Sequence, residues 1–437
     1  MIRNYLKIAF RSIVNNGVYS FINIFGLAFG LSCSMLIVLW VIDERSFDKF
    51  HTYRNDLYQV YGNSPADNGI ASQGALPLPL LEALKNAEPA IRHATVTDWG
   101  GKHLLQFGDQ SFMKNGLYAS EDFLKMFSFE LVQGSVETAL KDPSSIVLTE
   151  SAALSLLGTK DAIGKMVRFD NATDLKVSGI LKDVPGNSSF QFEYLVPFAT
   201  YMSLQRWVGN SVNNWGNNAF QMYVQLNEGT DPLTVEQRQQ KLIKSNIEQS
   251  EMEIMLHALP RWRLYSNFEN GRSTDGAITQ VRMFSWVAVF ILVIACINFM
   301  NLATARSEKR AREVGIRKSV GSRRNELIFQ FLGESIVVTF VAFTLAICIT
   351  ELVLPFFNDM VDKRLSIDYT HPVFWVASLG IVVLTGLVSG SYPAFYLSSF
   401  NAASVLKGQK VSRSGNASPR KILVTLQFTF SIFLIAG

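Results

Sequence analysis

Four long apolar segments dominate the hydrophobic pattern of the chain. Charged residues are absent from residues 12–42, 283–305 and 369–406, and the fourth segment, 335–357, contains one acid, Glu351. Each segment is long enough to supply the roughly 20 apolar residues that a helix needs to cross a bilayer. A chain with four such segments is not a soluble enzyme. The predicted transmembrane helices are residues 18–42, 283–305, 335–357 and 372–399.

The segment between the first two predicted spans, residues 43–282, has a different pattern. It alternates short strand-like runs with short helical runs, which is typical of an α+β domain, and we expect two subdomains. The Asn- and Gly-rich stretch 208–218 predicts a long surface loop. The expected strands are 145–149, 175–181 and 219–226, and the expected helices are 80–86, 121–127, 150–157 and 233–249.

Both ends of the chain carry further helical patterns. Arg3, Lys7 and Arg11 recur at intervals of four within residues 1–17, which suits a cytoplasmic interfacial helix and equally an ordinary basic anchor before a first span. Residues 422–437 are apolar but short, so we expect the start of a fifth transmembrane helix in a fragment of a longer protein or a truncated reading frame.

These patterns together predict the fold class. The chain is expected to be an α-helical membrane protein with four transmembrane helices plus the start of a fifth. A large α+β extracytoplasmic domain is inserted between the first and second helices. Composition agrees, since only 17% of the 437 residues are charged, against about 25% in a soluble domain.

The net charge of +4 is unevenly distributed and predicts the topology. Residues 43–282 hold 22 basic and 28 acidic residues, whereas 1–17, 306–326 and 400–421 all carry a basic excess. By the positive-inside rule the three basic stretches are cytoplasmic, and 43–282 and the loop 358–371 lie outside the cytoplasm. Membrane lipid is therefore an expected partner. Nucleic acid is not, because no basic stretch combines with interleaved aromatic residues on a soluble domain.

The sequence offers no catalytic constellation and no cofactor site. The five histidines lie too far apart for a local metal motif, and the three cysteines all fall within predicted spans, so no disulfide framework is expected in 43–282. Residues 158–165 resemble a phosphate-binding loop, but five residues separate the glycines and Met166 stands where a Mg²⁺-binding hydroxyl is required. We expect no enzymatic activity, no metal and no bound cofactor.

Polar residues inside the predicted spans are few. Only Glu351 is ionisable there, which argues against an ion or proton pathway. Asn298 and Asn301, three residues apart late in the second span, face nearly the same way on a helix. Interhelical packing through hydrogen bonds is favoured for both over contact with a substrate.

Several segments resemble one family, the FtsX-like permeases of ABC transporters with a MacB-type periplasmic core domain. The main match is ACINFMNLATARS at 295–307, followed by EVGIRKSVG at 313–321 and QFLGES at 330–335. The stretch GSYPAFYLSSF at 390–400 is similar to the pattern that ends a permease unit in this family. Further similar segments lie in the α+β region at 122–129, 146–151, 163–165 and 179–185.

The resemblance implies the first unit of a Bacteroidetes-type double-unit permease in the bacterial inner membrane. Such a permease has no ATPase of its own and works with a separate cytoplasmic ABC ATPase, a second permease unit and, in some cases, a periplasmic adaptor. ATP hydrolysis is coupled to movement of the periplasmic domain, a mode called mechanotransmission, for export of peptides, drugs or lipoproteins. Two alternatives are a non-transporting signal transmitter that regulates cell-wall hydrolases and a membrane sensor with a ligand-binding ectodomain.

Residues 306–334, between the second and third spans, form the expected cytoplasmic coupling loop or helix. Their basic character alone would follow from the positive-inside rule. The segment also contains Val314, Ile316 and Val320, an apolar pattern that charge placement does not require.

A short helix over residues 307–316, ended near Gly321, would present apolar anchors flanked by charges to a groove on a partner. The resemblance implies that this is the coupling helix that contacts the ATPase subunit. The expected coupling residues are Glu313, Val314, Gly315, Ile316, Arg317, Lys318 and Gly321.

Overall fold

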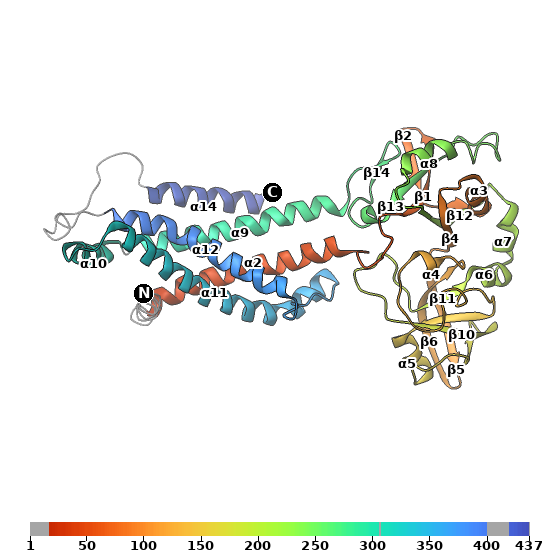
Figure 1. The fold of residues 1–437 in the computed structure, drawn as a ribbon, viewed down its shortest axis with the longest axis horizontal. Coiled ribbons are helices and arrows are strands. Elements are labelled where there is room, and N and C mark those ends of the chain that lie inside the picture. Colours follow the sequence, from red (N-terminus) through yellow and green to blue (C-terminus); the bar gives the residue numbers. More distant parts are fainter. Residues whose placement is uncertain (1–16, 306, 400–418, 437) are drawn as a thin grey trace. The chain divides into compact units, whose positions relative to one another are not determined.

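The computed structural model describes residues 17–305, 307–399 and 419–436, which fold as two compact units (Figure 1). The helical unit contains Met1–Ile42 and Val281–Gly437, and the α+β unit contains Asp43–Gln280. The interfacial helix expected at 1–17 lies, apart from its last residue, outside the described residues. So does most of the linker expected at 400–421.

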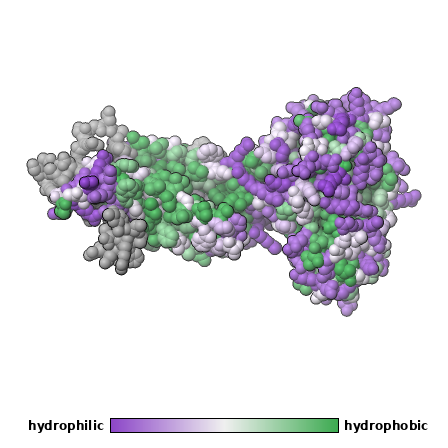
Figure 2. All heavy atoms as spheres, viewed as in Figure 1, coloured by the Kyte–Doolittle hydropathy of each residue, from purple (hydrophilic) through white to green (hydrophobic). Residues whose placement is uncertain are grey.

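The helical unit is built on long apolar helices, over which Figure 2 shows the hydrophobic side chains gathered. Among the described residues, four helices are long and apolar enough to cross a membrane, with mean hydropathy of 2.1 to 2.4 in their most apolar stretches. At 1.5 Å per residue, each exceeds the ~30 Å thickness of a hydrocarbon core. These helices are α2 (Gly17–Ser46), α9 (Ala277–Ala305), α11 (Arg324–Val361) and α12 (Pro372–Ser398). With the α+β region between the first two of them, the predicted fold class is confirmed.

The helices extend beyond the charge-free runs that predict them. α11 begins at Arg324, well before residue 335, because the backbone N–H of Arg323 donates to the Glu326 carboxylate (3.1 Å) and closes the first turn. It ends where Asp362 adopts a left-handed conformation, φ +50°. Charge-free runs mark only the apolar middle of a helix. The segment 306–334, expected as one coupling element, is therefore α10 (Ser307–Ser319), a turn and the first three turns of α11.

Small residues allow the long helices to approach closely. A Cβ added at Gly30 of α2 would lie 2.6 Å from a side chain of α9, and one added at Gly390 of α12 would lie 2.5 Å from Ser335 Oγ of α11. The hydroxyls of Ser32 and Thr350 share a hydrogen bond of 2.9 Å between α2 and α11. Such close contacts and polar pairs stabilise helix packing where lipid removes the hydrophobic driving force.

The α+β unit contains a 13-stranded sheet whose strands form two groups. In the first, β11 pairs antiparallel with β8 and parallel with β6, so the path β11-β8-β10-β9-β5-β6 closes on itself. Gly116 permits the closure, because a Cβ there would lie 2.1 Å from the ring of its partner Tyr194. The strands are β5 (Gly101–Phe107), β6 (Gln110–Ala119), β8 (Ser145–Thr149), β9 (Met166–Phe169), β10 (Thr173–Leu181) and β11 (Tyr194–Pro197), with β7 (Leu131–Gln133) beside β10.

The second group joins the first through one register pair, Thr97 of β4 opposite Ala119 of β6. Its strands follow the order β4-β12-β1-β13, all antiparallel. The two expected subdomains are thus two strand groups of one continuous sheet. The second group comprises β1 (Leu57–Ala66), β2 (Gly69–Gln73), β3 (Leu76–Pro77), β4 (Ile91–Thr97), β12 (Asn218–Leu226) and β13 (Glu253–Ala258), and a separate hairpin contains β14 (Phe268–Glu269) and β15 (Arg272–Ser273).

The expected strands correspond to β8, β10 and β12, whereas two other expectations differ from the structure. The helix expected over 233–249 ends early, at Gln239, and turns follow it over residues 240–246. The stretch 208–218, expected as a loop, begins with ordered helical turns, which the Ser211 hydroxyl stabilises by donating to Trp207 O (2.8 Å). The helices are α3 (Leu80–Ala87), α4 (Phe123–Met126), α5 (Glu150–Leu157), α6 (Phe198–Leu204), α7 (Arg206–Gly209), α8 (Pro232–Gln239), η1 (Asn210–Asn213) and η2 (Leu259–Arg261).

Large aromatic side chains fill the core of the α+β unit. Phe123 and Phe127 are fully buried, and their ring centroids lie 4.9 Å apart. Phe190 contacts both rings edge-on, at 5.1 and 4.8 Å. The unit contains no cysteine, so burial of apolar surface holds it together without disulfides.

Candidate functional site

The α10–α11 connection is the best-defined candidate site of the helical unit. Gly321 has φ +105°, a left-handed conformation that glycine adopts without steric cost, and its N–H donates to Lys318 O (3.1 Å). The N–H of Ser322 donates to Arg317 O (3.0 Å). These two bonds end α10 and let the chain turn directly into α11.

Val314 attaches α10 to the rest of the helical unit. Its side chain is only 1% exposed. The expectation that Val314 is presented to a partner is therefore wrong, because this side chain packs against other helices of the same chain. The reason lies in the helix period, which places Val314 and Ile316 about 200° apart around the axis. Val314 shares its cluster with Leu327 and Phe331 of α11 and with Ala394 and Leu397 of α12.

Hydrogen bonds also hold α10 against α11 and α12. Lys318 Nζ donates to the carbonyl of Ser398 at the end of α12 (2.7 Å). Arg317 donates to Glu313 Oε1 one turn earlier (2.6 Å) and to Gln330 Oε1 of α11. Arg317 and Lys318 therefore hold α10 in place through bonds within the chain. Gly315 is buried as well.

The opposite side of α10 is exposed. Ile316 is 50% exposed, and Val320, directly after the last residue of α10, is 83% exposed. The Val320 N–H donates to Ile316 O (3.2 Å), so the two residues lie one helical turn apart. Glu313 and Arg312 lie exposed one turn earlier, and Arg323 lies just beyond the turn. This exposed α10 face therefore presents two apolar side chains bordered by charges, on a helix held by its neighbours. An apolar centre with a charged rim is the usual anatomy of a protein–protein interface.

Asn298 and Asn301 of α9 contact different helices. Asn301 Nδ2 donates to Gln427 Oε1 of α14 (Pro419–Ala436) at 3.3 Å. Asn298 Nδ2 lies 3.4 Å from the position that a Cβ would take on Gly26 of α2. Both side chains lie between helices, and the two amides do not form one shared polar site.

The loop that mimics a phosphate-binding motif has a local structural role. Gly158, at φ +70°, is the C-cap of α5, and its N–H donates to Leu154 O (3.1 Å). Gly164, at φ +84°, turns the chain before β9. Lys165 Nζ lies over the ring of Phe107, 5.5 Å from its centroid. Within residues 17–305, 307–399 and 419–436 there is also no group of three or more metal-ligating side chains placed to hold an ion.

Two known families match the chain in succession. Residues 20–242 match the MacB-like periplasmic core domain, and residues 285–402 match the FtsX-like permease C-terminal region. The first match covers most of α2 and most of the α+β unit, and the second runs from within α9 to the end of α12.

Curated relatives are distant but extensive. The Macrolide export ATP-binding/permease protein MacB 2 of Aeromonas hydrophila subsp. hydrophila is 20% identical over 402 residues, which cover 90% of this chain and 58% of that protein. The Macrolide export ATP-binding/permease protein MacB of Bdellovibrio bacteriovorus is 26% identical over 271 residues, 60% of this chain and 38% of that protein. The chain spans about half the length of the curated relatives it matches.

Solved structures resemble part of the chain. A domain of a permease protein from Porphyromonas gingivalis is 22% identical, covering 53% of this chain and 99% of that one, with a TM-score of 0.42. The periplasmic region of MacB from Actinobacillus actinomycetemcomitans is 18% identical, covering 46% of this chain and 89% of that one, with a TM-score of 0.34.

The family resemblance seen in the sequence is confirmed by these comparisons. The match to the periplasmic core domain alone covers more than half of the chain, and the permease match follows it in chain order. Relatives from Aeromonas hydrophila and Haemophilus ducreyi, which cover 90% and 88% of this chain, carry MacB names. The chain therefore belongs to the MacB-like permease family, with a MacB-like periplasmic core domain followed by an FtsX-like permease region.

Proposed function

We propose that this chain is a permease subunit of an ABC transporter that works with a separate cytoplasmic ATPase. ATP hydrolysis would move the helical unit and thereby the periplasmic α+β unit, for export of peptides, drugs or lipoproteins. The observation that carries the proposal is the exposed α10 face, with Ile316 and Val320 at its centre. A second permease unit and a periplasmic adaptor are the further partners of the proposed assembly.

Charge supports the orientation that this function needs. The α10 region, residues 306–326, has eight basic and three acidic residues, and residues 400–421 have five basic and no acidic residues. Both therefore belong on the cytoplasmic side, where an ATPase binds, and residues 43–282 belong in the periplasm.

The end of α2 offers a route for mechanical coupling. This helix continues to Ser46, beyond the boundary of the helical unit, and Glu44 near its end accepts two hydrogen bonds of 2.7 Å from the Arg263 guanidinium. Just beyond the helix, Asp48 accepts from the backbone N–H of Ser189 (2.8 Å). A bidentate charged pair holds both position and orientation. Movement of α2 would therefore be passed directly to the α+β unit.

The orientation can be tested with single cysteines in a variant lacking Cys33, Cys296 and Cys348. A membrane-impermeant maleimide added to intact spheroplasts should label Cys at Asn214 and should label Cys at Val320 only after lysis. The opposite labelling pattern would place α10 outside and exclude an ATPase contact there.

The docking role can be tested by co-purifying the chain with a candidate ABC ATPase. Ile316→Ala should weaken the association about 30-fold, since truncating a buried interface anchor costs about 2 kcal/mol. Arg323→Ala, a matched removal of an exposed charge beside the same face, should change it less than about fivefold. Equal effects of the two substitutions would leave only a topogenic role for the segment. Normal association with unchanged export but altered cell-wall hydrolysis would favour a signal transmitter instead.

A further inference from the structure

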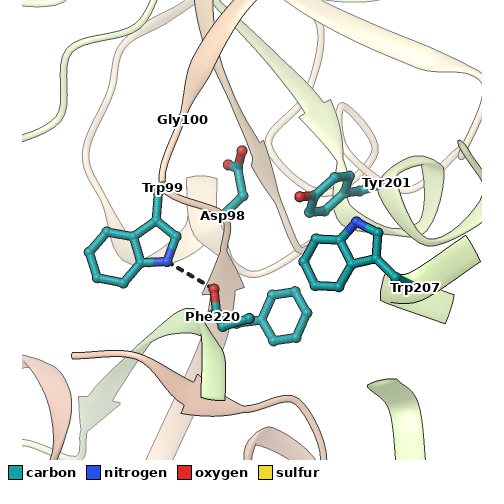
Figure 3. Close-up of a pocket in the computed structure, with 7 residues that line it drawn as sticks. Asp98, Trp99, Gly100, Tyr201, Trp207 and Phe220 are labelled. Atoms are coloured by element: carbon teal, nitrogen blue, oxygen red, sulfur yellow. Dashed lines mark hydrogen bonds between the residues drawn. The ribbon is translucent and has the colours of Figure 1, made fainter. Parts of the chain in front are cut away.

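The α+β unit contains a pocket where its two strand groups meet. It has a volume of about 370 Å³ and lies between the β4–β5 connection, the α6–α7 segment and the start of β12 (Figure 3). That volume lies at the small end of the usual range for small-molecule sites, about 300–1,000 Å³. The principal side chains of the pocket are Asp98, Trp99, Tyr201, Trp207 and Phe220.

Four of these side chains are aromatic, and their partners hold them in place. The Trp207 ring stacks on Phe220, with centroids 5.7 Å apart and an interplanar angle of 11°, and meets Tyr201 edge-on at 5.9 Å. Tyr201 in turn stacks on Tyr118 at 4.3 Å. Trp99 donates its indole N–H to the carbonyl of Ala219 (2.8 Å). The walls are therefore ordered without a ligand.

Two of the rings are far more exposed than large aromatic side chains usually are. Trp99 is 59% exposed and Trp207 is 47% exposed. Exposed aromatic surface next to a concavity is costly for a water-facing domain and commonly marks a binding site. Here both rings line the same pocket, so a shared binding role explains their exposure better than two unrelated causes do.

A carboxylate lies among these rings. Figure 3 shows Asp98 between Trp99 and Tyr201. One oxygen accepts the backbone N–H of Tyr118 (2.9 Å), and no Lys, Arg or His forms an ion pair with Asp98 within residues 43–280, all of which the structure describes. Burial raises the pKa of Asp98 to about 6, against the opposing effect of backbone N–H groups such as those of Tyr118 and Gly100 and of nearby His103, so the group is mostly an anion at neutral pH.

We propose that this pocket binds a small organic ammonium group, with the cation over the Trp207 and Tyr201 rings and its charge facing Asp98. Aromatic faces attract cations through their negative quadrupole, most strongly for Trp, and groups of such faces are suited to alkylated ammonium groups, which water solvates weakly. The Asp98 carboxylate supplies the remaining attraction. A neutral ligand of the same shape would gain the apolar contact but not the attraction to this charge. The site does not depend on ATPase docking at α10.

The test compares choline with 3,3-dimethylbutan-1-ol, a neutral molecule of nearly the same shape. Binding to the full chain in maltoside micelles is followed by saturation-transfer NMR of the ligand methyl groups, which avoids interference from the seven tryptophans. Choline should bind at least about tenfold more tightly than the alcohol. Phosphocholine is tested as a further ligand. If it binds as tightly as choline, the natural ligand is a lipid headgroup; if it does not bind, the natural ligand is a free amine.

Variants assign the binding to the pocket. Asp98→Asn keeps an oxygen for the Tyr118 N–H but removes the charge, and Trp207→Ala removes the main face; each should weaken choline binding about tenfold or more. Trp207→Phe should retain most of it. Asp109→Asn, an exposed carboxylate at the β5–β6 turn, should change nothing.

Three results would overturn the proposal. They are equal affinity for choline and the neutral alcohol, an equal loss of binding in Asp109→Asn and Asp98→Asn, and no saturable choline binding up to about 100 mM. Should the pocket variants fail to fold, the choline and alcohol comparison on the unmodified chain decides alone.

Discussion

The helical unit and the α+β unit are stabilised by opposite means. Helices of the first approach through glycines such as Gly30 and Gly390 and share a buried hydroxyl pair, Ser32 and Thr350. The second buries clustered aromatic rings such as Phe123 and Phe127. The difference follows from the solvent, since lipid offers no hydrophobic driving force between helices whereas water does.

This contrast changes how exposed apolar residues are interpreted. Trp286 of α9 and Trp375 of α12 are 62% and 56% exposed, but they lie on helices apolar enough to face lipid. Trp99 and Trp207 have similar exposure in a unit whose surface is largely hydrophilic (Figure 2). Lipid contact therefore explains the exposure of Trp286 and Trp375, whereas the exposure of Trp99 and Trp207 indicates a binding site. Ile316 and Val320 belong to the second kind as well, because α10 is a polar helix rich in charged residues.

The largest expected effect is a cavity in the aromatic core. Phe127→Ala should destabilise the α+β unit by about 3–5 kcal/mol, because the ring is fully buried among other rings that cannot collapse into its place. Hydrogen exchange measured by mass spectrometry on the full chain reports the exchange rates of peptides from the two units separately. Faster exchange should be confined to peptides of residues 43–280; equal acceleration in α11 and α12 would show that the units share one stability.

Acid should also destabilise the α+β unit selectively. Burial lowers the pKa of His51 and of His257 to about 4. In the unfolded chain each titrates near 6.5, so the unfolded state binds more protons and stability falls as the pH drops from about 6.5 towards 4. At pH 5 the loss should be about 2 kcal/mol for each histidine.

The histidine contribution can be isolated by comparing urea unfolding at pH 7 and pH 5. Burial raises the pKa of Asp98 to about 6, and this group offsets part of the loss because its folded form takes up a proton in the same range. His51→Gln should therefore reduce the pH dependence. An unchanged dependence in that variant would assign the acid sensitivity to other groups.

Overpacking tests the close helix contacts. Gly390→Val should destabilise the helical unit by about 1–3 kcal/mol, since the added atoms meet Ser335. Gly380→Val is the matched control on the same helix, because nothing lies within 4 Å of a Cβ at that position. Thermal unfolding in detergent should separate the two variants. The same loss in both would mean that glycine flexibility, rather than close packing, is what the helix needs.

The smallest expected effect concerns the attachment of α10. Val314→Ala should loosen α10 from α11 and α12 by about 1–2 kcal/mol, because two buried methyl groups are lost. Ile316→Ala should leave exchange in α10 unchanged while weakening ATPase association. If Val314→Ala left exchange in α10 as slow as before, the polar bonds of Arg317 and Lys318 would be sufficient to hold the helix.

Much of this protein follows from the sequence alone. The four apolar segments predict the long helices because a span needs only length and the absence of charge, both local properties. Strands such as β8 and β10 are predictable from short apolar runs, and α5 from its apolar pattern between Thr149 and Gly158. The family motifs are likewise contiguous in the chain, so short stretches of sequence are sufficient to carry the resemblance.

Other features depend on contacts between distant residues, and only the tertiary structure decides them. Two valines of one segment look equivalent in sequence, yet Val314 is buried against α12 and Val320 is exposed, because the direction of a helix face depends on what packs beside it. The closed ring requires Tyr194 to pair with Gly116, 78 positions earlier. The pocket brings together Asp98, Trp207 and other residues more than 100 positions apart, and no local period encodes that meeting.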